Sequence, residues 1–323
     1  MTKTSCIGES DGNRFQQSNN GGPCLSPLVS FVVLTYNQVH FAEDTMASAL
    51  SQDYPNLEIV VSDDASQDGT FDVMQDYMRR HSSDKIVRLN RNETNMGLVP
   101  HLNYVMKNFV HGEIVVLAGG DDISMPNRVK DSVDLFNSNC RIMAVTGQAI
   151  IIDKEGTTTG EYRRFNAGLY SLDDRFIRST SFMSGGMGVA FRKKEVWDEF
   201  GELHPLCPTE DSTLRFRALL RGQIAVADGV FLKYRIHGDN MSGPVNLHKL
   251  SAKGISRQYL CDLDVAKEMS LVPDSVLRRL RRKAKLNCCY RQLLKMLSQH
   301  TNRCIRAPYK ILLIIVKRVA KRL

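Results

Sequence analysis

The chain has 323 residues, 42% of them hydrophobic and 24% charged, with a formal net charge of +8. This composition is typical of a globular protein, and the length suffices for one large domain with a sizeable extension. No apolar run is long enough to cross a membrane, residues 1–26 lack the apolar core of a secretory signal, and the eight cysteines contain no C-x-x-C pair. These features exclude a membrane-spanning protein and disfavour a zinc protein, and they predict free thiols in a reducing compartment.

Strands and helices alternate over the first half of the chain. Residues 1–26 are polar and are predicted to form a disordered leader. Strands are predicted over Val29–Thr35, Leu57–Val61, Ile86–Leu89 and Glu113–Leu117, and helices over Phe41–Gln52, from Asp68 to about Arg80, over Val99–Asn108 and from Pro126 onward. The alternation predicts a parallel sheet with helices on both faces, in which all strands end at one edge.

The second half is less regular. Strands are predicted over Arg141–Ile152, Met187–Phe191, Ile224–Ala227 and Val230–Ile236, and helices over Lys194–Phe200 and Glu210–Arg221. Residues 157–184 are polar and are predicted to be irregular, whereas the chain from about residue 247 reads as helical and basic. We therefore predict one domain over residues 27–245 and a basic helical tail over residues 246–323.

Acidic residues follow two of the predicted strands. Gly119 and Gly120 end the strand that begins at Glu113, and Asp121 and Asp122 come next. Adjacent carboxylates repel each other unless a cation or hydrogen-bond donors offset their charge, and oxygen ligands suit Mg²⁺ or Mn²⁺. The alternative is a turn with two solvated acids. A second pair, Asp63-Asp64, and Thr35 end strands at the same edge, where open α/β sheets bind ligands.

Six motifs, in order along residues 27–243, resemble glycosyltransferase family 2, the inverting, sugar-nucleotide-dependent enzymes with the GT-A fold. The motifs are Val-Leu-Thr35-Tyr-Asn37, Val-Ser-Asp63-Asp64-Ala-Ser, Asn95-Met-Gly97, Gly-Gly-Asp121-Asp122-Ile-Ser-Met-Pro126-Asn-Arg128, Thr209-Glu210-Asp211 and Tyr-Arg-Ile-His237. The resemblance, which extends to bacterial O-antigen and capsule glycosyltransferases, implies an α/β fold. It would have a single Rossmann-like, mostly parallel sheet with helices on both faces, followed here by the basic helical extension.

The resemblance also implies roles for residues at the sheet edge. Thr35 and Asp64 would contact the nucleobase and ribose of a sugar nucleotide, with Asp63 in support, because a carboxylate accepts hydrogen bonds from base N–H and ribose hydroxyl groups. The nucleotide-sugar site would also include Asn37, Asn95 and Asp121. The alternative for Asp63 and Asp64 is capping of the following helix.

Further implied roles concern the metal and the reaction. Family members often carry Asp-x-Asp-Asp, and here Gly119 replaces the first Asp. Asp122 and His237 would bind Mn²⁺ or Mg²⁺, which neutralises the leaving diphosphate; a surface histidine is the alternative for His237. In the acidic pair Glu210-Asp211, Asp211 would be the general base that takes the proton of the acceptor hydroxyl. Alternatively, both acids only favour the dipole of their helix.

The C-terminal tail is strongly basic. Fifteen of the 43 Lys and Arg residues, and no acid, lie between Ser275 and Leu323, so the rest of the chain has a net charge of −7. Within residues 308–323, a helix would place apolar residues on one face and cations beside it, the pattern of an interfacial helix on anionic lipid. A helix docked on the protein's own core and a nucleic-acid patch are the alternatives; for nucleic acid, interleaved aromatic residues and a recognisable module are lacking.

Together these patterns predict a cytoplasmic glycosyltransferase, peripheral on the inner face of the plasma membrane. It would move a sugar from a UDP-sugar to a hydroxyl of a lipid-linked saccharide in bacterial surface polysaccharide synthesis, with no nucleic-acid partner. Two other classes stay open. A nucleotidyltransferase would need a phosphate-cradling glycine-rich loop near the first strand, which residues 35–38 do not provide. A non-catalytic binding protein on the same fold is disfavoured because Asp122 and Asp211 are retained.

Overall fold

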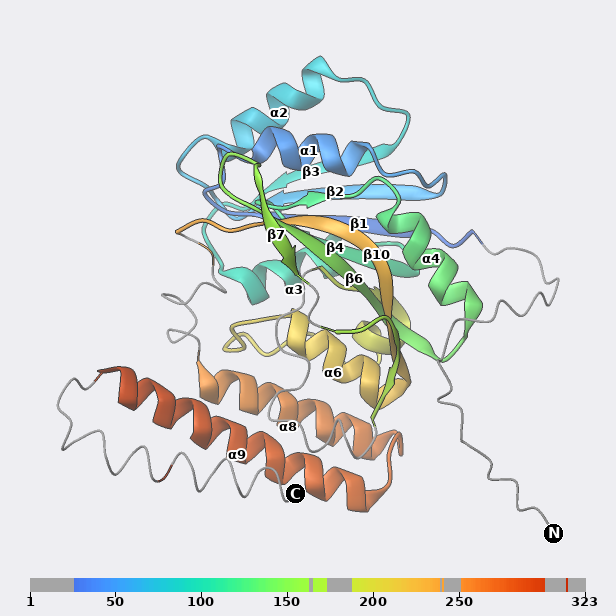
Figure 1. Ribbon diagram of the computed structural model, residues 1–323, viewed down its shortest axis with the longest axis vertical. Coiled ribbons are helices and arrows are strands. Elements are labelled where there is room, and N and C mark those ends of the chain that lie inside the picture. The colour runs from blue at the N-terminus through green and yellow to red at the C-terminus, as the bar shows by residue number, and fades with distance from the viewer. Residues whose placement is uncertain are drawn as a thin grey trace, which may run out of the picture.

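The computed structural model describes residues 26–162, 165–172, 188–238, 240, 251–299 and 312. Ten strands form one sheet in the order β3-β2-β1-β4-β9-β6-β10-β5, with β7 paired to β6 and β8 paired to β10. Helices cover both faces of this sheet (Figure 1). In the described part of the chain, no helix is both long and apolar enough to cross a membrane. The predicted leader and the segment 308–323 lie outside the described residues, apart from Ser26 and Leu312.

The first four long strands are parallel and end at one edge. They are β1 (Val29–Thr35), β2 (Leu57–Asp63), β3 (Ile86–Arg91) and β4 (Ile114–Gly119). β1 lies between β2 and β4, and its register pairs Thr35 with Asp63 and Leu34 with Gly119. Loops that leave these strands therefore start side by side, as predicted from the sequence.

Alternating side chains of the strands build one core on each face of the sheet. Phe31 and Val33 of β1 face a core shared with α1 (Ala42–Leu50), α2 (Thr70–Arg80) and α4 (Arg128–Ser138). Val32 faces the opposite core, which includes α3 (Leu98–Asn108), the π-helix η1 (Lys194–Asp198) and α6 (Asp211–Arg221). The strands with both faces buried account for the long apolar runs of the sequence.

The second half of the sheet is mixed. Its strands are β5 (Ile123–Ser124), β6 (Ile142–Ile152), β7 (Thr158–Tyr162), β8 (Gly168–Ser171), β9 (Ala190–Arg192) and β10 (Gln223–Arg235). The long strands β6 and β10 pair in parallel, and the short strands join antiparallel. The prediction of irregular structure was wrong for β7 and β8. The two strands predicted over 224–236 are a single strand, whose register shifts between Val226 and Val230.

The helical extension is confirmed for its described part and forms a third layer. α8 (Ala252–Glu268) packs against α6 on the side away from the sheet, and α9 (Asp274–Gln299) lies beside α8 (Figure 1). Phe216 and Leu220 of α6 share an apolar core with Tyr259 and Leu263 of α8 and Leu280 of α9. α6 is thus buried on two sides, between the sheet and the extension.

A buried ion pair joins α6 to α8. The Arg217 Nε donates to Asp262 Oδ1 at 2.9 Å, and both side chains are almost completely buried. Arg217 Nη1 also donates to the Gly201 carbonyl at 2.9 Å, and Gln258 Nε2 donates to the same Asp262 oxygen at 2.9 Å. Because removing one partner of such a pair leaves a buried charge, it typically costs about 3–5 kcal/mol. The extension is therefore attached through polar as well as apolar contacts.

Candidate active site

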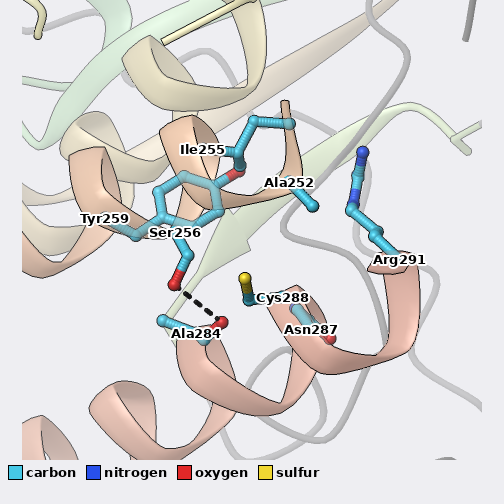
Figure 2. A pocket seen from close by; sticks show the side chains of 8 residues that line it. All are labelled: Ala252, Ile255, Ser256, Tyr259, Ala284, Asn287, Cys288 and Arg291. Atoms are coloured by element: carbon cyan, nitrogen blue, oxygen red, sulfur yellow. Dashed lines mark hydrogen bonds between the residues drawn. The ribbon is translucent and has the colours of Figure 1, made fainter. Parts of the chain in front are cut away.

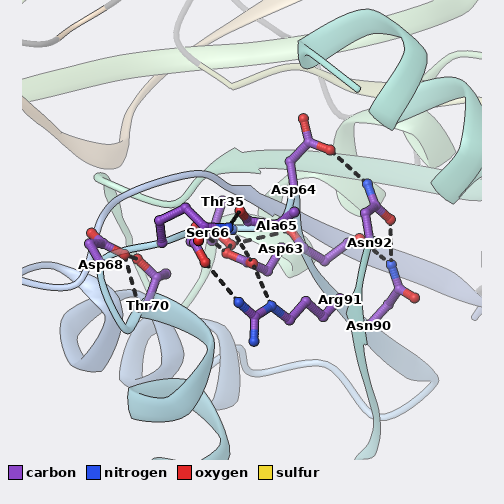
Figure 3. A network of polar contacts seen from close by, with 12 residues as sticks. Thr35, Asp63, Asp64, Ala65, Ser66, Asp68, Thr70, Asn90, Arg91 and Asn92 are labelled. Carbon is purple, nitrogen blue, oxygen red and sulfur yellow. Dashed lines mark hydrogen bonds and ion pairs between the residues drawn. The ribbon is translucent and has the colours of Figure 1, made fainter. Parts of the chain in front are cut away.

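The end of β1 is joined to the turn that follows β2. Thr35 Oγ1 donates to Asp63 Oδ1 at 3.1 Å, and the Ser66 N–H and hydroxyl donate to the Asp63 carboxylate at 2.8 and 2.5 Å (Figure 3). Arg91 Nε lies 3.8 Å from the other Asp63 oxygen. Asp63 is completely buried. Its carboxylate therefore holds the turn and fixes Thr35, whereas its supporting role in nucleotide binding stays a prediction.

Asp64 organises the loop that precedes α3. Its carboxylate accepts hydrogen bonds from Asn92 Nδ2 at 2.8 Å and from the backbone N–H groups of Met96 and Gly97 at 2.9 and 2.8 Å. Asn95 Oδ1 also accepts from the Gly97 N–H, at 2.9 Å. The carboxylate thus lies just before α3, so Asp64 does not cap α2, the helix that follows it in the chain.

Asn37 joins the loops after β1 and β2. Its N–H donates to Ser66 Oγ at 2.8 Å, and its side-chain oxygen accepts from the Gln67 N–H at 3.0 Å. Asn37 has φ of +52°, a left-handed conformation that asparagine tolerates better than most residues. The first turn of α2 is instead bound by Asp68, which accepts from the Thr70 N–H at 3.0 Å. Thr35, Asn37, Asp63, Asp64 and Asn95 are thus brought together in two adjoining networks.

Gly120 allows the second acidic pair to approach β1. A Cβ atom at this position would lie 2.4 Å from Thr35 Cγ2 and 2.3 Å from Gln38 Oε1, so no larger residue fits. Thr45 Oγ1 of α1 donates to the Gly120 carbonyl at 2.8 Å and holds the loop from the other side. The absence of a side chain at Gly120 therefore brings Asp121 beside the end of β1.

The two acids of this pair have different partners. Asp121 Oδ2 lies 3.1 Å from His237 Nε2 and 3.3 Å from Asn240 Nδ2. Asp122 Oδ1 accepts from the Arg235 N–H at 3.0 Å. His237 was predicted to share a metal with Asp122, but the structure places its ring against Asp121. The other carboxylate oxygens are Asp121 Oδ1 and Asp122 Oδ2. A Cβ atom built on Gly119 would lie 2.9 and 3.7 Å from them, so both oxygens face the space beside Gly119.

These oxygens suit a hard divalent cation but do not complete its ligand set. Carboxylate oxygen is the ligand type that Mg²⁺ and Mn²⁺ prefer. Within the residues that the structure describes, no three or more His, Cys, Asp or Glu side chains are grouped so as to hold a metal. Mg²⁺ is commonly bound by one or two carboxylates, with substrate phosphates and water as the other ligands. The residues therefore fit a metal that is bound together with a diphosphate.

Two buried arginines beneath the acids were not predicted as part of the site. Arg235 donates to the Asp121 carbonyl at 2.9 Å and to Asp44 Oδ2 of α1 at 2.8 Å. Arg128 donates to the Leu117 carbonyl of β4 at 2.5 Å. Burial raises the pKa of Asp122 well above its usual value and the Asp121 charge raises it further, whereas the Arg235 N–H and the charges of Arg128 and Arg235 lower it. Both arginines stand within the motifs that carry the family resemblance, Arg128 six residues after Asp122 and Arg235 two residues before His237, but neither had been given a role.

The third acidic pair stands at the start of α6. Asp211 Oδ1 accepts from the Ser212 N–H at 2.5 Å, and Asp211 Oδ2 lies 3.7 Å from Arg215 Nη1. Burial, and next the charge of Asp211, raise the pKa of Glu210 to about 7. An acidic side chain that exchanges its proton near neutral pH is suited to acid–base chemistry. The position in the first turn also favours the helix dipole, so both interpretations of this pair remain compatible with the geometry.

The raised pKa of Glu210 makes the stability of the protein depend on pH. The folded state keeps a proton that the unfolded state, with an ordinary pKa of 4.5, has released, so stability falls as the pH rises through about 7. Glu210→Gln, which is neutral at every pH, is expected to be more stable than the wild type by up to about 3 kcal/mol at alkaline pH. The difference should vanish in acid, below pH 4.5. Urea unfolding over this pH range checks the prediction, and a difference independent of pH would contradict it.

Several solved structures share this fold. TarS of S. aureus, residues 1–349, has a TM-score of 0.57 at 16% identity, covering 91% of this chain and 90% of that chain. The mannosyltransferase PcManGT of Pyrobaculum calidifontis, solved with GDP-Man and Mn²⁺, has a TM-score of 0.57 at 16% identity, covering 96% and 91%. TarS has also been solved with UDP-GlcNAc. At this identity the likeness shows the fold alone, and it confirms the predicted GT-A class.

Comparison with known sequences gives the family. An uncharacterized glycosyltransferase of Rickettsia felis is 27% identical over 261 residues, which are 77% of this chain and 40% of that protein. EpsE of Bacillus subtilis, named as a glycosyltransferase, is 32% identical over 130 residues, 40% of this chain and 46% of that protein. The chain thus spans less than half the length of these two relatives. Residues 30–200, more than half of the chain, match the sequence profile described as Glycosyl transferase family 2. The chain belongs to glycosyl transferase family 2.

Proposed function

We propose that the protein is an inverting glycosyltransferase that uses a nucleoside diphosphate sugar. The observation that carries the proposal is the position of Asp121 and Asp122, directly after β4 and beside the end of β1, in a chain of this family. Carboxylates at this edge suit the diphosphate and its metal, and the Thr35–Asp63–Asp64 networks beside them suit the nucleoside.

In the proposed reaction, Asp211 takes the proton of an acceptor hydroxyl, and the oxygen of that hydroxyl attacks the anomeric carbon of the donor. The new C–O bond forms on the face opposite the leaving group, and the bond to the diphosphate breaks with its electron pair going to the nucleoside diphosphate. Mn²⁺ or Mg²⁺, when bound, offsets the charge that develops on the diphosphate. Asp122 and His237 are the ligands expected from the sequence, and the contact of His237 with Asp121 makes Asp121 a further ligand in this proposal.

The donor is proposed to be a UDP-sugar. TarS was solved with UDP-GlcNAc and PcManGT with GDP-Man, so the fold accommodates more than one nucleotide. A panel of UDP- and GDP-sugars with lipid-linked saccharide acceptors tests the proposal by the release of nucleoside diphosphate. We expect release with UDP-sugars, and only when acceptor and Mn²⁺ or Mg²⁺ are present. Release of sugar 1-phosphate, the leaving group when the nucleoside monophosphate is transferred instead of the sugar, would indicate a nucleotidyltransferase. Donor binding without any turnover would indicate a binding protein, and either result would refute the proposal.

The acceptor is proposed to be a lipid-linked saccharide of a bacterial surface polysaccharide, reached at the inner face of the plasma membrane. One relative, 27% identical over 136 residues, carries the name of a teichuronic acid biosynthesis glycosyltransferase, TuaG of Bacillus subtilis. The outer face of α9 adds support, because Arg278, Arg282 and Lys285 are exposed along one stripe at helical spacing, and the helix contains no acid after Asp274. Each such cation near an anionic lipid surface contributes roughly 1 kcal/mol to binding.

Charge reversal on α9 tests the membrane proposal. The triple variant Arg278→Glu, Arg282→Glu, Lys285→Glu should bind vesicles with anionic lipid at least about 100-fold more weakly than the wild type, because three attractive charges become repulsive. Flotation at low and high salt provides the measurement, and salt should weaken wild-type binding. The matched control replaces three exposed lysines outside α9 by glutamate: Lys107, Lys130 and Lys154. Equal binding by the α9 variant and this control would contradict the proposal.

A further inference from the structure

A small cavity lies between α8 and α9. It has a volume of about 10 Å³ and is lined by residues of both helices, among them Tyr259 and Cys288 (Figure 2). This volume holds about one water molecule. Beside it, Ser256 Oγ donates to the Ala284 carbonyl at 3.2 Å, which joins α8 to α9. The cavity is therefore too small for a nucleotide or a sugar, whereas the acidic pair after β4 lies at the sheet edge where α/β folds bind ligands.

One buried arginine connects this acidic pair with two other segments. The side chain of Arg235, at the end of β10, is 1% exposed. Its Nε donates to the Asp121 carbonyl at 2.9 Å. Its Nη1 donates to the carbonyls of Lys154 and Asp153, in the turn between β6 and β7, at 2.9 and 3.3 Å. Its Nη2 donates to Asp44 Oδ2 of α1 at 2.8 Å. All three nitrogens of the guanidinium are therefore bound, each by a different segment.

The face of the guanidinium is held as well as its edge. Its central carbon lies 4.7 Å from the centroid of the Phe41 ring, just before α1. The same ring packs against His237, with ring centroids 5.0 Å apart. Arginine suits such a position, because its planar cation bonds several acceptors along its edge and stacks on an aromatic ring. A lysine ammonium carries the same charge without the plane or the fork of donors, so it cannot replace these contacts.

The main chain of Arg235 contacts the two acids directly. Its N–H donates to Asp122 Oδ1 at 3.0 Å, and its carbonyl accepts from Asn240 Nδ2 at 2.9 Å. The same Asn240 nitrogen lies 3.3 Å from Asp121 Oδ2. The side chain of Arg235 thus fixes the backbone of Asp121, while its main chain fixes the carboxylate of Asp122. The direction of both carboxylates therefore depends on where Arg235 is held.

We propose that Arg235 is a positioning residue for the acidic pair: anchored on α1 and on the turn between β6 and β7, it directs both carboxylates toward the space beside Gly119. The inference rests on the proposed function, in which this pair binds a metal together with the diphosphate. It deepens that proposal, because it makes side chains that do not touch the metal part of its site. Asp44 is one of them, since its half-exposed carboxylate on α1 is linked to the acids through Arg235.

Arg235→Lys keeps the positive charge and removes the fork of donors. We expect Mn²⁺ to bind about 10- to 100-fold more weakly in the presence of UDP, the usual cost of losing a group that orients metal ligands. The magnetic resonance of the ion measures this affinity. Arg192→Lys is the matched control and should bind normally, because Arg192 of β9 also donates to two backbone carbonyls at 2.9 Å and lies over a phenylalanine ring. Equal affinity in the two variants would overturn the inference.

Variants of Asp44 test the same link from the surface, where the side chain is half exposed. Asp44→Ala should weaken the binding of Mn²⁺ with UDP at least about 3-fold, whereas Asp44→Asn, which keeps an oxygen for Arg235, should retain most of it. Glu43→Ala is the matched control, since it removes a similarly exposed acid of the same turn, which pairs with Arg80 at 2.5 Å. If Asp44→Ala binds as the wild type does, or if Asp44→Asn loses as much as Asp44→Ala, anchoring through Arg235 is refuted.

A third measurement needs neither metal nor turnover. In the metal-free protein, amide hydrogen exchange over residues 120–122 and 153–157 should be at least about 10-fold faster in Arg235→Lys than in Arg192→Lys, whereas exchange in β2 should be the same in both. If the wild type binds no Mn²⁺ with UDP and transfers no sugar from any donor, the proposed function fails, and this exchange result still decides whether Arg235 holds the acidic pair. Equal exchange in the two variants would refute the positioning role.

Discussion

Asp211→Asn is expected to lower kcat by about 10²–10⁴-fold, the usual cost of losing a general base. Asparagine keeps the size of the side chain and its ability to accept the Ser212 N–H, but its amide oxygen does not take up the proton of the acceptor hydroxyl. Donor affinity should be unchanged, because the lost interaction belongs to the transition state. Steady-state kinetics and calorimetric titration with the donor measure the two quantities separately.

Glu210→Gln is the matched control, since it also replaces a carboxylate by an amide in the same turn. We expect it to lose less activity than Asp211→Asn, because Glu210, with a pKa of about 7, is partly protonated at neutral pH. If Asp211→Asn transfers sugar at nearly the wild-type rate and Glu210→Gln does not, the assignment of the base within the pair is reversed.

The second large effect is expected at the acidic pair after β4. Asp122→Asn should reduce Mn²⁺-dependent nucleotide binding about 10²–10⁴-fold, because a metal on a diphosphate contributes several kcal/mol and each 1.36 kcal/mol is tenfold. The substitution keeps an oxygen to accept the Arg235 N–H, so the fold should persist. Binding of Mn²⁺ in the presence of UDP, followed by the magnetic resonance of the ion, gives a measurement independent of turnover.

Asp121→Asn tests whether Asp121, as well as Asp122, is a ligand of the metal. If His237 and Asp121 hold the ion, Asp121→Asn should lose as much Mn²⁺ binding as Asp122→Asn or more. Asp72→Asn, an exposed position on α2, is the control for the loss of one negative charge. Full sugar transfer in excess chelator, or Mn²⁺ binding unchanged in both variants, would contradict a metal at this pair.

The sequence predicted the first half of the fold well because three of its strands, β1, β2 and β4, are largely buried on both faces. Such strands read as continuous apolar runs, and polar turns separate them from the helices. β7 and β8 were missed because they lie at the side of the sheet and consist largely of polar and small residues, so their hydrogen bonds depend on the longer strands they join. β10 was divided in two because Asp228 and Gly229 interrupt its apolar pattern where its register shifts.

The candidate site was predicted as far as its residues follow strand ends. Thr35, Asp63 and Asp64 share an edge through the register of β1 and β2 alone. Arg235 could not be assigned in the same way, because its partner Asp44 is 191 residues away in the chain and no local pattern relates the two. Which of Asp121 and Asp122 meets His237 depends on side-chain direction, which adjacent residues do not share.

The Arg217–Asp262 pair has a consequence for how the protein unfolds. If α8 and α9 detached from an otherwise intact sheet, both charges would be left without their partner, and the apolar faces around Phe216 and Leu263 would meet water. A partly unfolded state of this kind is therefore high in free energy. The sheet and the C-terminal helices should melt in a single cooperative transition, and slow-exchanging amides of α8 should open only when the whole molecule does.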